Sequence, residues 1–549
     1  MTGIGTLLRT VRHLRPVQVF GRARFRLQRP RPDMRPAPPL RAGGGDWVMP
    51  ARRAASLLGA RRLRLLEVEH SLDEVGWDDS RVELLWRYNQ HYFDDLNAVD
   101  SLQRQSDQRA LLQRWLADNP PGRGTGWAPY PTSLRIVNWI KWFIGGTAPE
   151  PAWLHSLAVQ ARWLQGRMEW HLLGNHLFAN AKALVYAGLY FDGPEAESWL
   201  AQGVAILERE LPEQILADGG QFERSPMYHA LALEDVLDLL NLCTARASAT
   251  SAQHRLEPLL RERSPAMLAW LRCLTHPDGT LALFNDTAEG IAPPVGELER
   301  FAAALGVSAA QPLPQGISAL QPSGYLRVAR GAAVALIDAA PIGPDYLPGH
   351  AHADTLSFEL SLGQRRVVVN RGTSCYGTGA RRQFERGTAA HSTVQVGNHD
   401  SSEVWAGFRV GRRARPGPLG VDGWTVDASH DGYRHLPGRP THHRRWRFGE
   451  TDLRIEDRIA PTAPDSVSHL HLAPGLTLED AGANRWRVLD GLGALALIEV
   501  EAGRAAITDG LHAVRFGALA PAQTLEVCLV DGQARVRISW GADAHSVPL

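Results

Sequence analysis

The pattern of apolar residues changes at about residue 320, and this change limits the fold more than any other feature of the 549-residue chain. From about residue 78 to 310 the apolar positions recur with the period of a helix, in long segments with short polar links. Helical segments are expected at 108–117, 134–144, 151–169, 175–190, 194–211, 228–245 and 255–274, with a turn at 127–131 and a cap at Thr132 or Ser133 before the second. Segments of this kind suit antiparallel helical hairpins packed side by side.

After residue 320 the apolar residues alternate in short runs between Gly and Pro signals, which is typical of strands in a β-sandwich. Strands are expected at 324–330, 333–338, 366–370, 392–397, 446–448, 453–459, 468–473, 486–488, 494–500, 513–516 and 525–530. Helices followed by strands indicate separate domains rather than an alternating α/β fold. We therefore predict a basic arm over 1–46, a helical domain over 47–315 and an antiparallel β-sandwich over 316–549. The cleft between the two domains is the expected ligand site.

The N-terminal arm is rich in arginine, although the whole chain carries a formal net charge of only +1. That balance does not indicate nucleic acid as a partner. The first 25 residues fit a short amphipathic helix, either packed on the body of the protein or lying on a membrane surface. They contain no secretory signal, and the chain contains no apolar run of transmembrane length. We expect a cytoplasmic location, or a periplasmic one if translation begins upstream.

Four separated motifs contain the side chains best suited to chemistry. Gly174-Asn175-His176 opens a helical segment, where Asn175 would also serve as an ordinary helix cap. Ser225-Pro226-Met227-Tyr228-His229 opens another, where Tyr228 would also serve as a buried structural tyrosine. Gly349-His350-Ala351-His352-Ala353-Asp354 and His391-Ser392-Thr393 each precede a predicted strand.

Taken together and in this order, the four motifs resemble those of the heparinase II/III-like polysaccharide lyases and their alginate-lyase relatives. The stretches Tyr88–Phe93 and Trp127–Trp142 are also similar to the helical domain of that family. The resemblance implies an incomplete (α/α) toroid followed by antiparallel β-sheets. It also implies cleavage of an acidic, uronic-acid-containing polysaccharide by β-elimination, which leaves a 4,5-unsaturated uronate.

The resemblance implies a role for each motif residue in that reaction. Asn175 and His176 would neutralise the uronate carboxylate, which makes the neighbouring C5 proton removable. Tyr228 would protonate the leaving O4 and act as base in a syn elimination, whereas His350 would be the base for the opposite C5 epimer. A tyrosine base needs a lowered pKa, for which His176, Arg224 or a bound metal would supply positive charge.

Further polar residues near these motifs are predicted to contact the substrate. They are Tyr130, Arg135, Asn138, Glu223, Arg224 and His229. An ordinary helix surface would explain Arg135 and Asn138 nearly as well as an acidic-sugar site would.

The family resemblance also implies a structural zinc ion in the β-domain, and no organic cofactor. His352 and His391 match the two expected histidines, but Asn370 stands where the family has an aspartate. An amide oxygen is a poorer ligand for Zn²⁺ than a carboxylate is. Asp354 is the alternative third ligand.

Two other functions remain open from the sequence. An (α/α) glycoside hydrolase would need two carboxylates flanking the bond, for which Glu223 and Asp286 are the candidates. A non-catalytic protein that binds carbohydrate, or assembles with it in exopolysaccharide production, would keep the fold without turnover.

Overall fold

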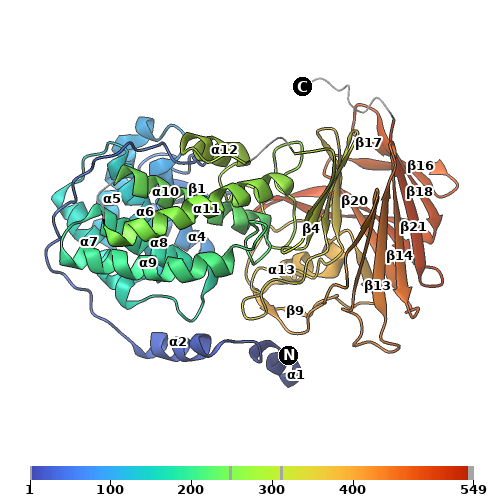
Figure 1. The fold of residues 1–549 in the computed structure, drawn as a ribbon, viewed down its shortest axis with the longest axis horizontal. Helices are drawn as coiled ribbons and strands as arrows, with labels where there is room; N and C mark the ends of the chain where they lie inside the picture. The colour runs from blue at the N-terminus through green and yellow to red at the C-terminus, as the bar shows by residue number, and fades with distance from the viewer. Residues whose placement is uncertain (1–2, 247–249, 310–312, 542–549) are drawn as a thin grey trace.

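In the computed structural model, which describes residues 3–246, 250–309 and 313–541, a helical domain leads into two large β-sheets (Figure 1). The last helix of the helical domain ends at Ala304, and the first strand of the large sheets begins at Gly316. Helices followed by an antiparallel β-domain are the order predicted from the sequence. Within the described ranges, none of the helices combines the length and apolarity needed to cross a bilayer.

The chain starts with an arm outside the main helical domain. The arm consists of α1 (Ile4–Val11), α2 (Pro16–Leu27) and an extended stretch. After the arm come a hairpin of β1 (Arg62–Leu65) and β2 (Val68–Ser71) and the short helix α3 (Leu72–Val75). In Figure 1, α2 lies beside the helical domain and α1 beside the β-domain.

The helical domain is built around α8, whose residues are almost all buried. Its helices are α4 (Leu84–Asn89), α5 (Gln105–Asp118), α6 (Pro129–Ile144), α7 (Pro151–Gly166), α8 (Gly174–Tyr190), α9 (Pro194–Gln214), α10 (Pro226–Ala245), α11 (Ser251–Cys273) and α12 (Val295–Ala304). α8 packs against α6, α7, α9 and α10. Because α8 has little polar surface, it can only be stable as the core of such a group.

The start of α6 differs from the sequence prediction. A turn was expected at 127–131, with Thr132 or Ser133 as the cap. The helix instead begins at Pro129, after Ala128 in an extended conformation. Proline suits the first helical turn, because a backbone N–H at that position would have no acceptor within the helix and its loss costs nothing. This earlier start puts Tyr130 inside the helix.

The β-domain is built mainly from two large antiparallel sheets, and a separate hairpin pairs β9 (Val404–Trp405) with β10 (Arg409–Val410). One has the order β11 (Gly420–Asp422), β12 (Thr425–His430), β13 (Thr441–Phe448), β14 (Asp452–Ala460), β21 (Gln533–Ser539), β18 (Ala494–Ala502), β17 (Arg485–Leu489) and β16 (Thr477–Gly482). The other has the order β19 (Arg504–Arg515), β20 (Ala518–Cys528), β15 (Ser466–Leu472), β7 (Arg365–Val369), β6 (Phe358–Leu362), β5 (Ala333–Asp338), β4 (Tyr325–Arg330) and β3 (Gly316–Leu320), and β8 (Val394–Val396) also pairs with β15.

The two sheets face each other across one apolar core. Buried and outward positions alternate along β13 and β14, as they do in strands with one solvated face. Trp446 of β13 packs edge-on against Phe358 of β6, with the ring centroids 6.4 Å apart. This shared core makes the domain a sandwich.

A buried arginine connects this core to the loops of the candidate site. Arg444 of β13 pairs with Asp457 through two bonds of 2.7 and 2.8 Å. Its third nitrogen donates to the carbonyls of Leu356 and Ser392. Those carbonyls belong to the loop that carries His350 and His352 and to the residue after His391, so the sandwich core holds both loops in place.

Close contact between α8 and α9 generates a testable prediction. A Cβ added at Gly188 would lie 2.7 Å from the carbonyl oxygen of Ala196 and from the backbone nitrogen of Leu200. Gly188→Ala should therefore force the two helices apart, destabilise the domain by about 1–3 kcal/mol and lower its Tm. Gly166→Ala is the matched control, because nothing lies within 4 Å of its added Cβ. Equal Tm values for the two variants would contradict the close packing.

Candidate functional site

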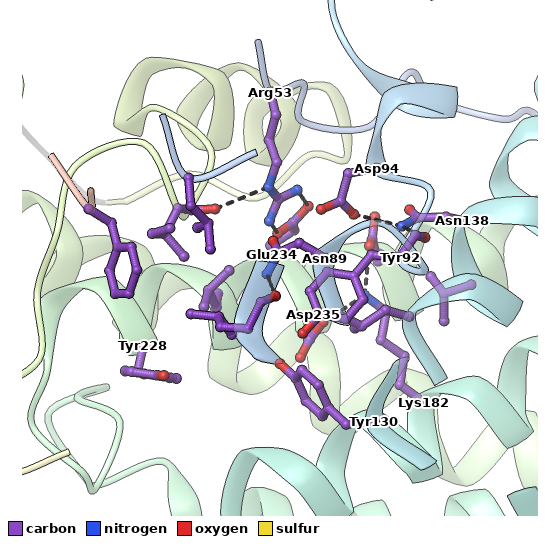
Figure 2. Close-up of a pocket in the computed structure, with 18 of the residues that line it drawn as sticks. Arg53, Asn89, Tyr92, Asp94, Tyr130, Asn138, Lys182, Tyr228, Glu234 and Asp235 are labelled. Carbon is purple, nitrogen blue, oxygen red and sulfur yellow. Dashed lines mark hydrogen bonds and ion pairs between the residues drawn. The ribbon is translucent and has the colours of Figure 1, made fainter. Parts of the chain in front are cut away.

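A cavity of about 150 Å³ lies on the inner side of the helical domain, next to the β-domain (Figure 2). Tyr130, Asn138 and Tyr228 line it from the helices, whereas Tyr376 and Phe516 come from the β-domain. Its polar wall also contains Arg53, Asn89, Tyr92, Asp94, Lys141, Lys182, Glu234, Asp235 and Asp238. The site therefore has contributions from both domains.

Tyr228 is in the first turn of α10, on the helical side of the site. Ser225 caps this helix by accepting the Tyr228 backbone N–H at 3.2 Å, and Pro226 occupies the first helical position. The Tyr228 hydroxyl lies 3.0 Å from the hydroxyl of Tyr376. Burial, followed by the nearby Tyr376 and Asp286, raises the pKa of Tyr228 well above its ordinary value. The phenol is therefore protonated in the ligand-free protein.

His350 stacks on Tyr228 and contributes the β-domain side of the same site. Their ring centroids lie 3.7 Å apart at an interplanar angle of 26°. His350 Nδ1 lies 3.0 Å from a carboxylate oxygen of Asp286. The carboxylate accepts that hydrogen bond. The other ring nitrogen, Nε2, lies 3.8 Å from a carboxylate oxygen of Glu223.

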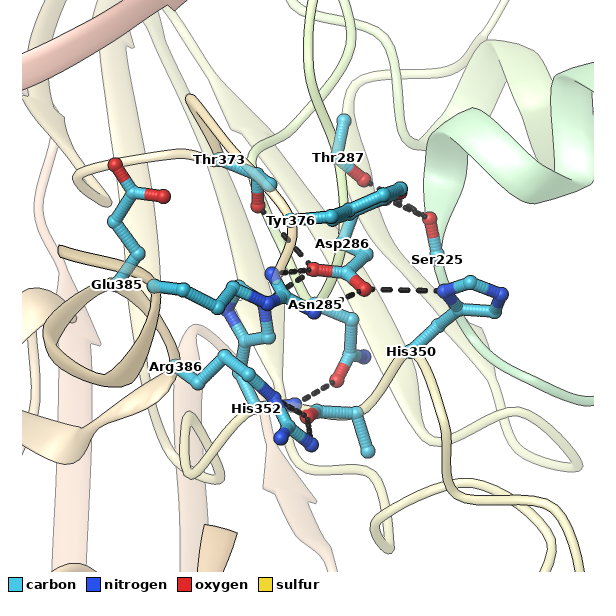
Figure 3. Close-up of polar contacts among 12 residues, drawn as sticks. Ser225, Asn285, Asp286, Thr287, His350, His352, Thr373, Tyr376, Glu385 and Arg386 are labelled. Carbon is cyan, nitrogen blue, oxygen red and sulfur yellow. Dashed lines mark hydrogen bonds and ion pairs between the residues drawn. The ribbon is translucent and has the colours of Figure 1, made fainter. Parts of the chain in front are cut away.

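Asp286 joins four side chains in one buried cluster (Figure 3). Besides His350, it binds His352 Nε2 at 2.8 Å, the Arg382 guanidinium through both oxygens and, at 3.5 Å, the Thr373 hydroxyl. Burial alone would raise the pKa of this carboxyl, but Arg382 and the two histidines outweigh it and hold the pKa well below the ordinary value. Asp286 is therefore a permanent anion that orients both rings.

The His350–His352 stretch is a loop between β5 and β6, not an extended segment. In an extended segment the two side chains would project to the same face. Here they bind opposite oxygens of Asp286, His350 stacked on the cavity residue Tyr228 and His352 fully buried. The loop thus separates their surroundings while one carboxylate holds both.

His352 and His391 meet at a pair of facing nitrogens. His352 Nδ1 and His391 Nε2 lie 3.1 Å apart. The opposite nitrogens donate to acceptors, since His352 Nε2 faces Asp286 and His391 Nδ1 faces the Gly387 carbonyl at 2.8 Å. Burial lowers the pKa of His352 to about 3 and also lowers that of His391. Both rings are therefore neutral, and two lone pairs face each other, an arrangement that suits a shared cation.

The third predicted metal ligand, Asn370, lies beside this pair. The Asn370 side-chain oxygen accepts the backbone N–H of Ser392 at 2.9 Å. The backbone N–H of Asn370 donates to the Glu359 carboxylate. The alternative, Asp354, accepts the backbone N–H of Asn285 at 2.8 Å. Among the described residues, no group of three or more His, Cys, Asp or Glu side chains is arranged so that it could hold a metal ion. The facing nitrogens of His352 and His391 are thus not part of a three-ligand cluster of these residue types.

Asn175 and His176 lie in the first turn of α8. The helix starts at Gly174 and Leu173 is its N-cap, so Asn175 is not the cap; both motif side chains are half-buried. The His176 ring packs on Tyr130 with centroids 4.6 Å apart, and its Nδ1 lies 3.3 Å from Glu169. Burial lowers the pKa of His176, but Glu169 and Glu223 outweigh it and raise the pKa above the ordinary value.

Tyr130, Asn138 and Glu223 are placed at the candidate site. Tyr130 and Asn138 line the cavity, where the Asn138 amide donates to Asp94 at 2.7 Å. Glu223 is buried beside His350, and burial raises the pKa of its carboxyl. These three positions agree with a substrate-contacting role, although their function stays a prediction.

The structure contradicts a substrate contact for Arg135, which is wholly buried in the helical core. Its guanidinium lies 4.0 Å from the centroid of the Trp115 ring and donates to Gln160 at 2.9 Å. A helix surface facing a cleft cannot be distinguished from one facing another helix by sequence period alone.

Arg224 and His229 are also structural residues rather than substrate contacts. Arg224, which the sequence offered as a positive charge near Tyr228, donates to the carbonyls of Ser323 and Phe222, and the neighbours that shift the pKa of Tyr228 most are Tyr376 and Asp286. His229 is fully buried, bonded to the Met267 carbonyl at 2.9 Å and packed on Trp270. Burial lowers the pKa of His229 to about 4, which keeps it neutral.

Several site residues were missed by the sequence analysis. Tyr376, Arg382 and Glu169 were not identified, and Asp286 was considered only as a hydrolase carboxylate. Arg382 comes from the short helix α13 (Ala380–Arg386), far along the chain from the residues that it contacts. No motif marks these positions, because they meet the site only through the tertiary fold.

Two family models match the chain. Residues 102–293 match the heparinase II/III N-terminus, and residues 312–541 match the heparinase II/III-like C-terminal domain. The chain belongs to the heparinase II/III-like family. The prediction of the family from the four motifs is therefore confirmed.

Individual relatives extend this assignment. FtsZ-localized protein C of Caulobacter vibrioides is 30% identical over 305 residues, which are 52% of this chain and 49% of that protein. A heparin-sulfate lyase of Pedobacter heparinus is 25% identical over 321 residues, 52% of this chain and 47% of that protein. The chain thus spans about half the length of these curated relatives. A crystal structure of heparinase III has the same fold, with a TM-score of 0.63 and 17% identity over 83% of this chain and 77% of that one.

The charge on His176 yields a prediction. Glu169→Gln should lower the pKa of His176, because it removes the carboxylate 3.3 Å from Nδ1. Since the folded pKa is raised, the stabilisation from this pair is present below the unfolded pKa of about 6.5. It is lost as the pH rises through the folded value. NMR titration of the His176 ring measures the change.

Glu213→Gln is the matched control for this titration, since Glu213 pairs with Arg15 instead. An unchanged His176 pKa in Glu169→Gln would show that Glu169 does not set the charge of this ring.

Proposed function

We propose that this protein is a polysaccharide lyase that cleaves a uronic-acid polymer by β-elimination. One observation carries the proposal: the Tyr228 phenol and the His350 imidazole stack at 3.7 Å beside a cavity. A proton donor and a proton acceptor are the two groups that the elimination needs at adjacent carbons of one sugar. Membership of the family supports the same chemistry.

Neutralisation of the substrate carboxylate falls to Asn175 and His176. The raised pKa of His176 favours its protonated form, which would pair with the uronate anion. Tyr130, stacked on His176, links this residue to the cavity. Neutralising the carboxylate stabilises the enolate-like transition state that forms when the C5 proton leaves.

Proton transfer is divided between His350 and Tyr228. His350 Nε2 takes the C5 proton, because Asp286 holds Nδ1 and leaves Nε2 as the free acceptor. The C5–H electrons form the C4=C5 double bond, the C4–O4 bond breaks, and O4 departs with the Tyr228 proton. A Tyr228 phenolate, needed for a tyrosine base, is opposed by burial and by Tyr376. His350 and Tyr228 regain their starting states by exchange with solvent.

The charges around the cavity favour a substrate with few sulfate groups. Each cation in the described cavity wall already has an acidic partner: Lys141 and Lys182 bind Asp238, and Arg53 binds Glu234. Sulfate recognition relies on cations with free donors. A carboxylated exopolysaccharide therefore fits this site better than a densely sulfated glycosaminoglycan.

The hydrolase alternative lacks its second carboxylate. Asp286 is fully buried and bound by Arg382, so it can neither reach a sugar nor exchange a proton with one. An inverting or retaining hydrolase needs both carboxyl groups at the scissile bond.

Carbohydrate binding without turnover is a second candidate. Glu223 lies 3.8 Å from His350 Nε2, so a carboxylate already faces the proposed base. The relative FtsZ-localized protein C has a name that states a location and no lyase activity, which keeps this candidate open. Cleavage of a bound polymer would distinguish the lyase from the non-catalytic carbohydrate-binding protein.

We also propose that His352 and His391 hold a structural Zn²⁺ ion, with Asn370 as a weak third ligand. Such an ion would hold the loop of His350 against the residues before β8, and it would resolve the facing lone pairs of the two rings. The ion has no part in the proton transfers.

Activity tests the proposal directly. Uronate polymers of low and high sulfation, incubated with the protein, should yield an ultraviolet-absorbing 4,5-unsaturated uronate. Tyr228→Phe should lower kcat about 100-fold or more, because the proton for O4 is removed. Tyr346→Phe is the control, since its hydroxyl binds Glu213 outside the cavity. Binding of a polymer without this chromophore would favour the non-catalytic candidate.

Metal affinity tests the histidine pair. Asn370→Asp should bind Zn²⁺ roughly tenfold or more tightly than the natural chain, because a carboxylate replaces the amide. Equilibrium dialysis with metal analysis measures this affinity. Asn484→Asp is the control at an exposed turn. The zinc proposal fails if neither the natural chain nor Asn370→Asp retains Zn²⁺.

A further inference from the structure

The helix α1 is attached to the protein by its polar face. Thr6 and Arg9 both donate to Glu403 at 2.8 Å, and Trp405 donates to the Thr10 hydroxyl at 3.0 Å. These contacts follow the helical period, so the opposite face is directed outward. That face is apolar: Ile4 is 79% exposed and Leu8 60%, and Val11 is exposed as well; Leu7 at its flank and Leu14 in the link to α2 are also exposed.

The helix α2 continues the same arrangement along the helical domain. Gln18 is buried and donates to the Tyr346 carbonyl at 3.1 Å, and Phe25 packs on His171 with ring centroids 4.4 Å apart. Its outward side presents Phe20 at 74% exposure and Leu27 at 81%, along with Val17 and Val19. An amphipathic helix that only covered the body of the protein would turn its apolar side inward.

The charge of the arm has one sign. Between residues 3 and 32 the chain contains no Asp or Glu, and its arginines are Arg9, Arg12, Arg15, Arg22, Arg24, Arg26, Arg29 and Arg31. Of these, Arg9 and Arg15 are used against Glu403 and Glu213 of the body. Arg12 and, on α2, Arg22, Arg24 and Arg26 are exposed.

We propose that the arm formed by α1 and α2 docks on an anionic lipid surface. Outward apolar side chains interleaved with arginine are the composition that inserts at the headgroup boundary of a bilayer. Anionic lipids complement the one-signed charge of the arm. The arm contains two separate helices (Figure 1), and both have exposed apolar side chains, as contact with an extended surface requires.

Docking through this arm would also place the candidate site. The arm contacts both domains, Glu213 of α9 on one side and Glu403 on the other. The Tyr346 carbonyl that Gln18 binds belongs to the loop that carries His350. A bilayer bound to the arm would therefore hold the site in a defined position near the membrane.

Vesicle flotation of the full chain tests the proposal. The protein should float with vesicles of phosphatidylglycerol and phosphatidylethanolamine, bind vesicles of phosphatidylcholine much more weakly, and lose binding as salt rises. Leu8→Gln combined with Phe20→Gln should weaken binding about tenfold or more. Leu492→Gln is the matched control, since Leu492 is 75% exposed in a β-domain turn outside the arm.

A charge variant tests the electrostatic part separately. Arg22→Gln combined with Arg26→Gln should weaken binding to the anionic vesicles about tenfold or more and reduce its salt dependence. All substituted side chains are exposed, so thermal unfolding should match the natural chain.

Three results would overturn the proposal. The first is no flotation of the natural chain with the anionic vesicles, and the second is equal binding by the Leu8→Gln, Phe20→Gln variant. The third is concentration-dependent self-association that this variant abolishes while the vesicles remain unbound, because the apolar face would then bind a second copy of the chain.

Discussion

The buried carboxylate of Asp286 is the interaction on which the candidate site depends. It comes from the segment between α11 and α12, yet all of its charged partners lie in the β-domain: His350, His352 and Arg382. A buried anion is costly unless it is paired and hydrogen-bonded, so this contact is stable only when both domains are in place. The domains therefore assemble the site when they pack together, and neither contains it alone.

The same carboxylate connects two different environments. Through one oxygen it orients His350, whose ring stacks on the cavity residue Tyr228. Through the other it orients His352, whose remaining nitrogen faces His391 in the core. Arg444 supports the arrangement by donating to the backbone carbonyls of Leu356, in the loop that carries His350 and His352, and of Ser392, next to His391. A change in the buried histidine pair would thus be transmitted to the ring at the cavity through one hydrogen-bonded group.

The cavity and the arm differ in their use of positive charge. Lysine and arginine side chains in the cavity wall are neutralised by buried acids, so the cavity has little free positive charge for a densely sulfated polymer. Arginines of α1 and α2 are interleaved instead with exposed apolar side chains. The first arrangement suits a weakly charged sugar chain, and the second suits an extended anionic surface. The two proposed functions are compatible, since they would occupy separate parts of the molecule.

The sequence by itself determined the order of the domains and the family. Helical and alternating periods are local properties of the chain, and the motifs around His176, Tyr228, His350 and His391 are continuous in sequence. It did not determine which polar side chains face the cavity. Arg135 and His229 are residue types that are common in binding sites, but both are buried in the core. The helical period alone does not say whether a helix face meets solvent or another helix.

Only the tertiary structure decided the membership of the site. Asp286 lies 64 residues before His350 in sequence, and Tyr376 lies 148 residues after Tyr228, so no local pattern connects them. Their roles arise from distances of about 3 Å that exist only after the domains pack. The outward direction of the apolar side chains on α1 was undecided for the same reason: the sequence shows an amphipathic helix, but contacts with Glu403 and Trp405 decide which side faces away.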